Sequence, residues 1–345
     1  EVQTLFEGVE GPATTLEISP DGRTVLAGLA DGKLVLWDLE TREEIARLHG
    51  HTARVNDVAL GPDGSIAISG GEDAQVILWD LATGQEIRRL RGHSGMVRAV
   101  DIGPDGRTAV SGGFAGTAGM EPGELILWDL QTGGEIRRLE GHIAGIVAAR
   151  LTPSGDALLA SSGVAAIFSD QLLGETLEPG LVPFDLILWD IETGQMRQRF
   201  DLAGDDVYCL SISSDGARAV TGSCYNNVSA VWDLGTGERI LTLTGHQEAV
   251  VSVAMGPDGR QVLSGSCDDS LIPWVLDTGQ PIARLDAHRS DVLDIAISPN
   301  GRTALSSSED GGLILWDLAD AAEVQRLVGH GDMVWDVALT PGGQR

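Results

Sequence analysis

A set of four side chains that could support hydrolysis recurs along the chain: a histidine, a serine, an aspartate and a tryptophan. Three copies have the same order and spacing: His51, Ser69, Asp73 and Trp79; His246, Ser264, Asp268 and Trp274; His288, Ser306, Asp310 and Trp316. A serine, a histidine and an aspartate in contact are the parts of a hydrolase triad, in which the histidine takes the proton of the serine nucleophile. An active site is built once, whereas this set is repeated. The sequence therefore favours a structural network, and we predict no catalytic residues.

Other signatures of chemistry are missing from the sequence. The chain has no phosphate-binding GxxxxGK, no HExxH, no GxSxG and no twelve-residue calcium loop. Its cysteines, Cys209, Cys224 and Cys267, do not form a CxxC pair, and free thiols in a reducing compartment are the simplest interpretation. We therefore predict no cofactor and no metal.

The elements that position these side chains follow from a repeat. Trp-Asp pairs occur at Trp37, Trp79, Trp128, Trp189, Trp232 and Trp316, with Trp274 followed by Val275, and Gly-His pairs recur in step. In the second copy, four short β-rich runs are separated by turn residues: Val55–Leu60, Ser65–Ser69, Gln75–Leu81 and Glu86–Leu90. Short runs bounded by Gly, Pro and Asp at this interval predict an all-β fold.

A period of about 40–45 residues with Gly-His and Trp-Asp signatures is typical of a four-stranded propeller blade. The chain thus resembles the WD-repeat β-propeller family, over nearly its whole length. Its near-identical blades, with LILWD at 125–129, 186–190 and 313–317, resemble the repeat arrays of bacteria. The resemblance implies antiparallel four-stranded blades in which the histidine, serine, aspartate and tryptophan form one hydrogen-bonded chain.

We predict a single propeller with seven complete blades. These span about 14–48, 55–90, 97–139, 146–200, 207–243, 250–285 and 292–327, with end strands at 2–6 and 333–339. The alternative is an eight-bladed ring whose incomplete last blade contains both end strands. Because the repeat stops part-way through a copy, we expect this chain to be a piece of a longer protein.

Two blades depart from the pattern by insertion. The third keeps His93, Ser111 and Trp128, and the fourth keeps His142, Ser161 and Trp189, but both lose the aspartate turn. The added residues lie within Phe114–Glu124 and Gly163–Asp185. The resemblance implies that both loops emerge on the same face as the Gly-His loops. Phe168 and Phe184 are too apolar for an idle solvated loop, so they either contact a partner or pack onto the blades.

The starts of the first strands supply further candidate partner-binding residues. The resemblance implies that these positions surround the mouth of the channel, and the candidates there are Arg54, Asn56, Met96, Arg98, Tyr208, Asp291, Leu293 and Trp335. Aromatic and arginine side chains around a shallow mouth suit a protein or peptide partner. For Trp335, packing within an incomplete end blade is the alternative.

Charge and hydropathy limit the partners. A net charge of −28 opposes nucleic-acid binding because phosphates are repelled, and no apolar run reaches a membrane span. We predict a non-catalytic, cytoplasmic interaction scaffold or sensor module within a larger bacterial signalling protein, of unspecified oligomeric state. The alternatives are an enzyme with its site at the channel mouth under the insertion of the fourth blade, or a structural spacer.

Overall fold

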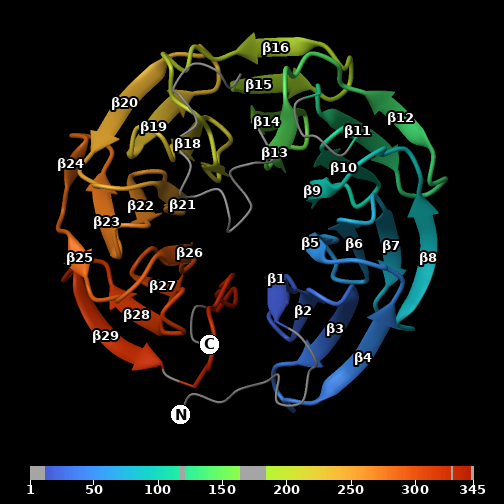
Figure 1. The fold of residues 1–345 in the computed structure, drawn as a ribbon, viewed down its shortest axis with the longest axis horizontal. Helices are drawn as coiled ribbons and strands as arrows, with labels where there is room; N and C mark the ends of the chain where they lie inside the picture. The colour runs from blue at the N-terminus through green and yellow to red at the C-terminus, as the bar shows by residue number, and fades with distance from the viewer. Residues whose placement is uncertain (1–11, 117–120, 164–183, 328, 343–345) are drawn as a thin grey trace. The chain divides into compact units, whose positions relative to one another are not determined.

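The regular structure of this protein consists of β-strands. The computed structural model describes residues 12–116, 121–163, 184–327 and 329–342. Within these ranges every assigned element is a strand, and the strands form seven antiparallel sheets (Figure 1). Each sheet contains strands that follow one another in sequence. The predicted all-β fold, a β-propeller of seven four-stranded blades, is confirmed.

The first three blades have four strands each. Blade one contains β1 (Ala13–Ile18), β2 (Thr24–Leu29), β3 (Lys33–Asp38) and β4 (Glu44–His49). Blade two contains β5 (Val55–Leu60), β6 (Ile66–Gly71), β7 (Val76–Asp80) and β8 (Gln85–Leu90). Blade three contains β9 (Val97–Ile102), β10 (Thr108–Gly113), β11 (Glu124–Asp129) and β12 (Glu135–Arg138).

The other four blades repeat this order, and in blade six two short strands share the fourth place. Blade four contains β13 (Gly145–Leu151), β14 (Ala157–Gly163), β15 (Asp185–Asp190) and β16 (Met196–Arg199). Blade five contains β17 (Cys209–Ile212), β18 (Arg218–Gly222), β19 (Val228–Asp233) and β20 (Arg239–Thr244). Blade six contains β21 (Val250–Met255), β22 (Gln261–Ser266), β23 (Ser270–Val275), β24 (Gln280–Pro281) and β25 (Leu285–Asp286). Blade seven contains β26 (Val292–Ile297), β27 (Thr303–Ser308), β28 (Leu313–Asp317) and β29 (Ala322–Leu327).

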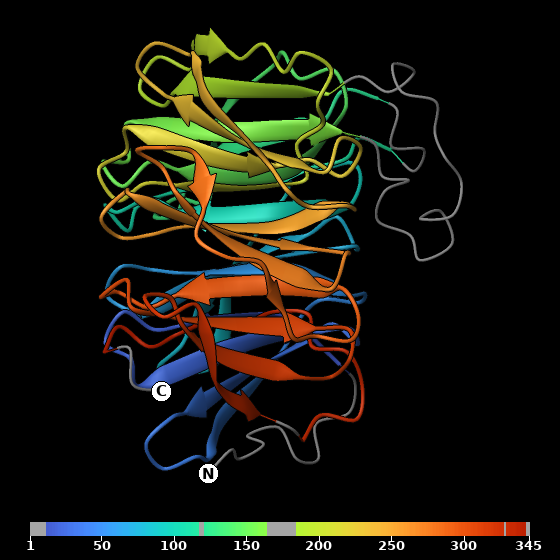
Figure 2. The same cartoon turned by 90° about the vertical axis from the view of Figure 1, so that its left-hand side faces the viewer.

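Within a blade the strands run between two sets of loops (Figure 2). In blade two, the turn that joins β5 to β6 closes with a bond from Gly64 N to Gly61 O. Gly64 has a φ of 70°, a conformation that glycine adopts without steric cost. At the other end of β6, Gly71 begins the turn that carries Asp73. The second and third strands are thus held between a tight hairpin turn and the loop that bears the polar residues.

The core lies between neighbouring sheets. One cluster joins Ile68 and Leu78 of blade two to Val97, Val100 and Trp128 of blade three, all of them buried. Burial of a large apolar side chain contributes about 1.5–3 kcal/mol. Fourth strands are different, since β8 exposes its first half and buries only Leu90 fully. Blades two and three therefore share one apolar core.

The described residues fall into two compact units. One comprises 26–36 and 44–207, and the other comprises residues up to 25, 37–43 and those from 208 onward. In the second unit, the segment from Met333 to Thr340, which contains the predicted end strand 333–339, is not assigned as a strand. The other predicted end strand, residues 2–6, lies outside the described residues.

This C-terminal segment lies between β26 and β1. Val337 N donates to Asp294 Oδ2 at 3.0 Å, and Leu16 N donates to Asp336 Oδ2 at 2.8 Å. In the other unit, Val100 N donates to Asp57 Oδ2 at 2.9 Å in the same way, from the first strand of one blade to that of the blade before it. The segment therefore occupies a first-strand position after the seventh blade.

Candidate interaction site and its hydrogen-bond networks

The polar set of blade two is brought together by β6, β7 and the two loops at one end of them. His51 Nε2 lies 2.7 Å from Ser69 Oγ, and His51 Nδ1 lies 2.8 Å from Asp73 Oδ1. Trp79 Nε1 donates to Ser69 Oγ at 2.8 Å. Because an indole only donates, the serine uses its own hydrogen toward His51 Nε2, which leaves Nδ1–H to donate to Asp73. All four side chains therefore have partners in one directed chain.

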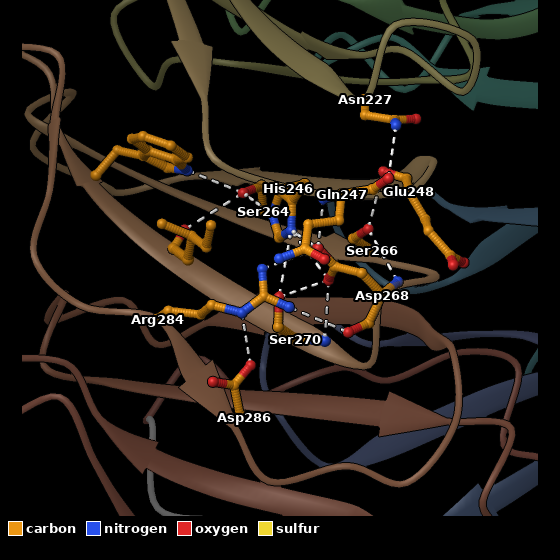
Figure 3. A network of polar contacts seen from close by, with 12 residues as sticks. Asn227, His246, Gln247, Glu248, Ser264, Ser266, Asp268, Ser270, Arg284 and Asp286 are labelled. Carbon is orange, nitrogen blue, oxygen red and sulfur yellow. Dashed lines mark hydrogen bonds and ion pairs between the residues drawn. The ribbon is translucent and has the colours of Figure 1, made fainter.

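Blade six contains the same network with additional partners (Figure 3). His246 Nε2 lies 2.8 Å from Ser264 Oγ, and the aspartate Asp268 also accepts from Ser270 Oγ at 2.5 Å and Arg284 Nη1 at 3.0 Å. Burial lowers the pKa of His246, although Asp268 opposes this effect. Burial works to raise the pKa of Asp268, but the bonds from Ser270 and Gln247 outweigh it and lower the value to about 2. The pair is thus a neutral imidazole and an ionised carboxylate at neutral pH.

Blade seven completes the three predicted copies. His288 Nε2 lies 2.7 Å from Ser306 Oγ, and Trp316 Nε1 donates to the same oxygen at 2.9 Å. His288 Nδ1 and Asp310 Oδ2 are 3.4 Å apart. Burial lowers the pKa of His288 despite this carboxylate, so the histidine is again neutral at pH 7.

The geometry around the serine explains why this set is not a hydrolase triad. Ser69, Ser264 and Ser306 have no exposed surface. In each case a tryptophan N–H occupies the acceptor site of the hydroxyl, which a nucleophile needs for attack on a carbonyl carbon. These serines bond tryptophan to histidine and cannot reach a substrate.

Blade three lacks the aspartate turn, as the sequence indicates, but a different acid lies beside its histidine. Glu124, at the start of β11, accepts from Ser94 N at 2.7 Å and lies 3.4 Å from His93 Nδ1. In blade two, Asp73 accepts from Thr52 N in the same manner at 2.8 Å. The ring of His93 and the amide of Ser94 lower the pKa of Glu124 to about 2, although burial opposes them. The carboxylate therefore comes from a residue that follows the insertion in the sequence.

Blade four also has a different acid beside its histidine, and it departs from the predicted network at the serine. Asp185, the first residue of β15, lies 2.5 Å from His142 Nδ1, so this blade also keeps its acid. Trp189 Nε1 donates directly to His142 Nε2 at 3.2 Å, which bypasses the predicted serine. Ser161 Oγ is buried and has no hydrogen-bond partner among the described residues, whereas Ser162 Oγ donates to Asp185 at 2.6 Å. Sequence alignment of the blades could not detect this change, because both serines lie on the same strand.

Sequence reasoning missed the arginines of the fourth strands. Arg89 Nη2 donates to the carbonyl of Gly50 at 2.9 Å, and Arg138 Nη2 donates to that of Gly92 at 2.8 Å. Arg199 contacts Gly141 in the same way at 2.6 Å and also bonds Asp185 at 2.9 Å. These guanidinium groups fix the residue before the histidine. The recurrent arginine before the last apolar residue of the fourth strand was the available signal.

The predicted partner-binding residues lie beside these loops. The carbonyls of Arg54, Met96 and Asp291 accept from the first residue of the turn after the second strand, at 2.9, 3.0 and 3.0 Å. Their side chains are half-buried. Asn56 Nδ2 donates to Val97 O at 2.9 Å, so this amide joins neighbouring first strands. The three carbonyls tie the starts of the first strands to the turns that differ between blades.

The other predicted partner-binding residues are found in both compact units. Arg98 and Phe184 are half-buried in the same unit as Arg54, and Phe184 packs near Gly163. The half-buried residues Tyr208, Leu293 and Trp335 belong to the other unit, as does Asp291. Phe168 lies outside the described residues. The candidates therefore belong to two groups, one in each unit.

Acidic residues surround the thiol of Cys267. Burial, a hydrogen bond to Asp291, and the negative charges of Asp291, Glu248 and Glu309 all raise its pKa. Because the thiolate is the nucleophile and the metal ligand, the raised pKa of Cys267 disfavours both roles at neutral pH. All three cysteines are free.

The described residues include no group of three or more histidine, cysteine, aspartate or glutamate side chains arranged to hold a metal ion. In the part of the chain that the structure describes, no helix has the length and apolar character needed to cross a lipid bilayer.

Comparison with known families identifies the repeat. The family model "WD domain, G-beta repeat" matches residues 1–38, 42–80, 84–119, 196–233, 237–272 and 279–317, more than half of the chain. Each match ends at or near the third strand of a blade, and the residues between 120 and 195, which include the longer insertion, are not matched. No curated protein sequence matches the chain.

Proposed function

The chain belongs to the WD-repeat family, and we propose that it is a non-catalytic scaffold or sensor module that binds a protein or peptide. Propellers of this family commonly serve as interaction scaffolds. We further propose that it works within a bacterial signalling protein in the cytoplasm. The near-identical LILWD runs at 125–129, 186–190 and 313–317 support the bacterial assignment.

The observation that carries the proposal comes from blades three and four. There, Glu124 and Asp185 supply the carboxylate that the aspartate turn supplies in blade two. Both residues bond the loop that follows the histidine, as Asp73 does in blade two. The blade networks therefore tolerate loops of very different length between the second and third strands. Variable loops on a rigid scaffold are where binding usually resides.

The proposed contact face is the one that carries the Gly-His loops. In blades two and six the bonds to the acid place the Gly-His loop next to the turn after the second strand. Arg54, Met96 and Asp291 lie at the junction of these two loops. The net charge of −28 favours a basic partner, because opposite charge accelerates encounter and suppresses acidic competitors.

A loop deletion tests the proposal. Residues 166–181 are replaced by a short Gly-Ser linker, with Phe184 and Asp185 retained so that the network of blade four stays intact. Partners are captured from host lysate on the intact protein and on the deletion variant. The control variant carries Ile87→Ser and Ile136→Ser, which alter two exposed side chains of fourth strands.

The outcome depends on which variant loses the partner. We expect the deletion variant to lose a partner that the intact protein and the control both retain, with circular dichroism showing that all three fold. Loss of the partner with the control variant alone would place binding on the fourth strands and contradict the proposed face.

A further inference from the structure

Two aspartates hold the C-terminal segment between β26 and β1. Asp294 of β26 accepts from Val337 N at 3.0 Å and from Ser252 Oγ at 3.0 Å. Asp336 of the segment accepts from Leu16 N of β1 at 2.8 Å. Each carboxyl thus bonds the backbone of the next element, and together they join blade seven, the segment and blade one.

The two carboxyl groups also contact each other. Asp294 has a side-chain hydrogen bond with Asp336, and burial is the main cause that raises the pKa of Asp294. An ionised carboxylate only accepts hydrogen bonds, so a bond between two carboxyl groups requires that one of them carries a proton. The pair therefore holds one proton between two partly buried acids, as close carboxylates do in other proteins.

In the other unit, Asp57 holds the position equivalent to that of Asp294, but its charged neighbour is different. Asp57 also accepts an N–H from the next first strand, Val100 N, but Arg150 Nη1 lies 3.4 Å from its carboxyl group. Burial raises the pKa of Asp57 as well, although the guanidinium of Arg150 opposes this effect. At Asp294 the neighbouring charged group is the carboxyl group of Asp336, and not a cation.

No basic side chain is available on the strands around the pair. The neighbouring elements are β21, β22, β27, β1 and the segment Met333–Thr340, all within the described ranges. Apart from Asp336, their only ionisable side chain is Glu17 on β1, and it is acidic. A proton is thus the only positive charge that these elements supply to the pair.

We propose that Asp294 and Asp336 form a proton-dependent clasp that keeps residues 333–340 seated between β26 and β1. With one proton shared, the carboxyl groups bond each other and both backbone amides. Loss of that proton puts two negative charges in contact at a partly buried site and loosens the segment.

The direction of the pH dependence follows from the proton count. The unfolded aspartate releases its proton in the ordinary range, whereas the folded pair keeps its proton to higher pH. Between these two pKa values the folded state binds more protons, so the contribution of the pair to stability falls as the pH rises. The clasp is closed at lower pH and loosened once the pH exceeds the raised pKa.

The indole N–H of Trp335 reports on the segment directly. The intact protein is labelled with ¹⁵N at its tryptophan indoles, and Trp335→Phe identifies the resonance of Trp335. Its chemical shift is followed against pH in the wild type, Asp294→Asn, Asp336→Asn and, as a matched control, Asp57→Asn. In either of the first two variants an amide replaces one acid and donates to the other without a shared proton.

We expect the wild-type resonance to shift with a transition above the range of ordinary aspartates, and Asp57→Asn to keep that transition. Asp294→Asn and Asp336→Asn should each abolish it. A transition confined to the ordinary range, or one that persists in either Asn variant, overturns the proposal. If neither Asn variant folds, the wild-type titration still decides, because absence of the higher transition excludes the shared proton.

Discussion

Asp185 lies 2.5 Å from Nδ1 of His142, although the two residues are 43 positions apart in the sequence. In blade two the corresponding pair, His51 and Asp73, is separated by only 22 positions. The longer insertion thus falls between these two residues in the sequence, and their contact is still made. Blade four therefore keeps the contact between its histidine and an acid despite the inserted residues.

Replacing Asp185 should destabilise the protein. In Asp185→Ala, His142, Ser162 and Arg199 all lose a partner in a buried or partly buried site. Leaving such groups unpaired costs about 3 kcal/mol in total. Urea unfolding followed by circular dichroism measures the shift in midpoint, and Asp201→Ala, at an exposed position, is the control. A midpoint equal to that of the control would show that Asp185 has no network role.

Two serines on equivalent strands should respond in opposite ways to the same substitution. Ser69→Ala removes the partner of both Trp79 and His51, which should cost about 2 kcal/mol. Ser161→Ala removes a buried hydroxyl that has no partner among the described residues, so it should be neutral or slightly stabilising. Thermal unfolding of the two variants side by side checks the difference, and equal losses would contradict the assignment.

The contribution of Asp268 in blade six to stability should depend on pH in the acidic range. The pKa of Asp268 falls from an ordinary 3.8 to about 2 in the folded protein. A lowered carboxyl pKa stabilises the fold above the unfolded value, and this contribution is lost as the pH falls through both values. We therefore expect the wild type to exceed Asp268→Asn by about 2 kcal/mol at pH 6 and to lose most of this advantage near pH 2. A difference that does not change between these pH values would be inconsistent with ionisation of Asp268.

Gly145 should not tolerate a side chain. A Cβ atom at this position would overlap the ring of Phe114, which is buried next to the insertion of blade three. Overpacking of this kind costs about 1–3 kcal/mol, so Gly145→Ala should lower the melting temperature. Gly331→Ala is the matched control, since nothing lies within 4 Å of its Cβ. Similar melting temperatures for the two variants would contradict the packing described here.

The repeat made the fold predictable. The period of the Trp-Asp pairs defines the blades, and the turn residues around Val55–Leu60 define strands that the structure places at the same bounds. The networks of blades two, six and seven follow from residues at constant spacing. Such patterns recur from blade to blade because each blade packs the same series of strands.

The remaining contacts depend on differences between blades, which spacing does not record. Glu124 and Asp185 follow the insertions in the sequence. They are therefore not found when an acid is expected at a fixed spacing after the serine. The contact between Asp294 and Asp336 joins different repeats, and only three-dimensional register reveals it. The arginines of the fourth strands recur visibly, but their carbonyl partners are backbone atoms without a sequence signature.

The most direct test of the central claim compares the binding of a captured partner to two surface variants. One variant carries Arg54→Ala and Met96→Ala beside the Gly-His loops, and the other carries Ile87→Ser and Ile136→Ser on the fourth strands. Binding to immobilised protein is measured as a dissociation constant. A scaffold that binds through the Gly-His face predicts at least tenfold weaker binding for the first variant, about 1.4 kcal/mol, and unchanged binding for the second. Unchanged binding by the first variant with loss in the second would contradict the account.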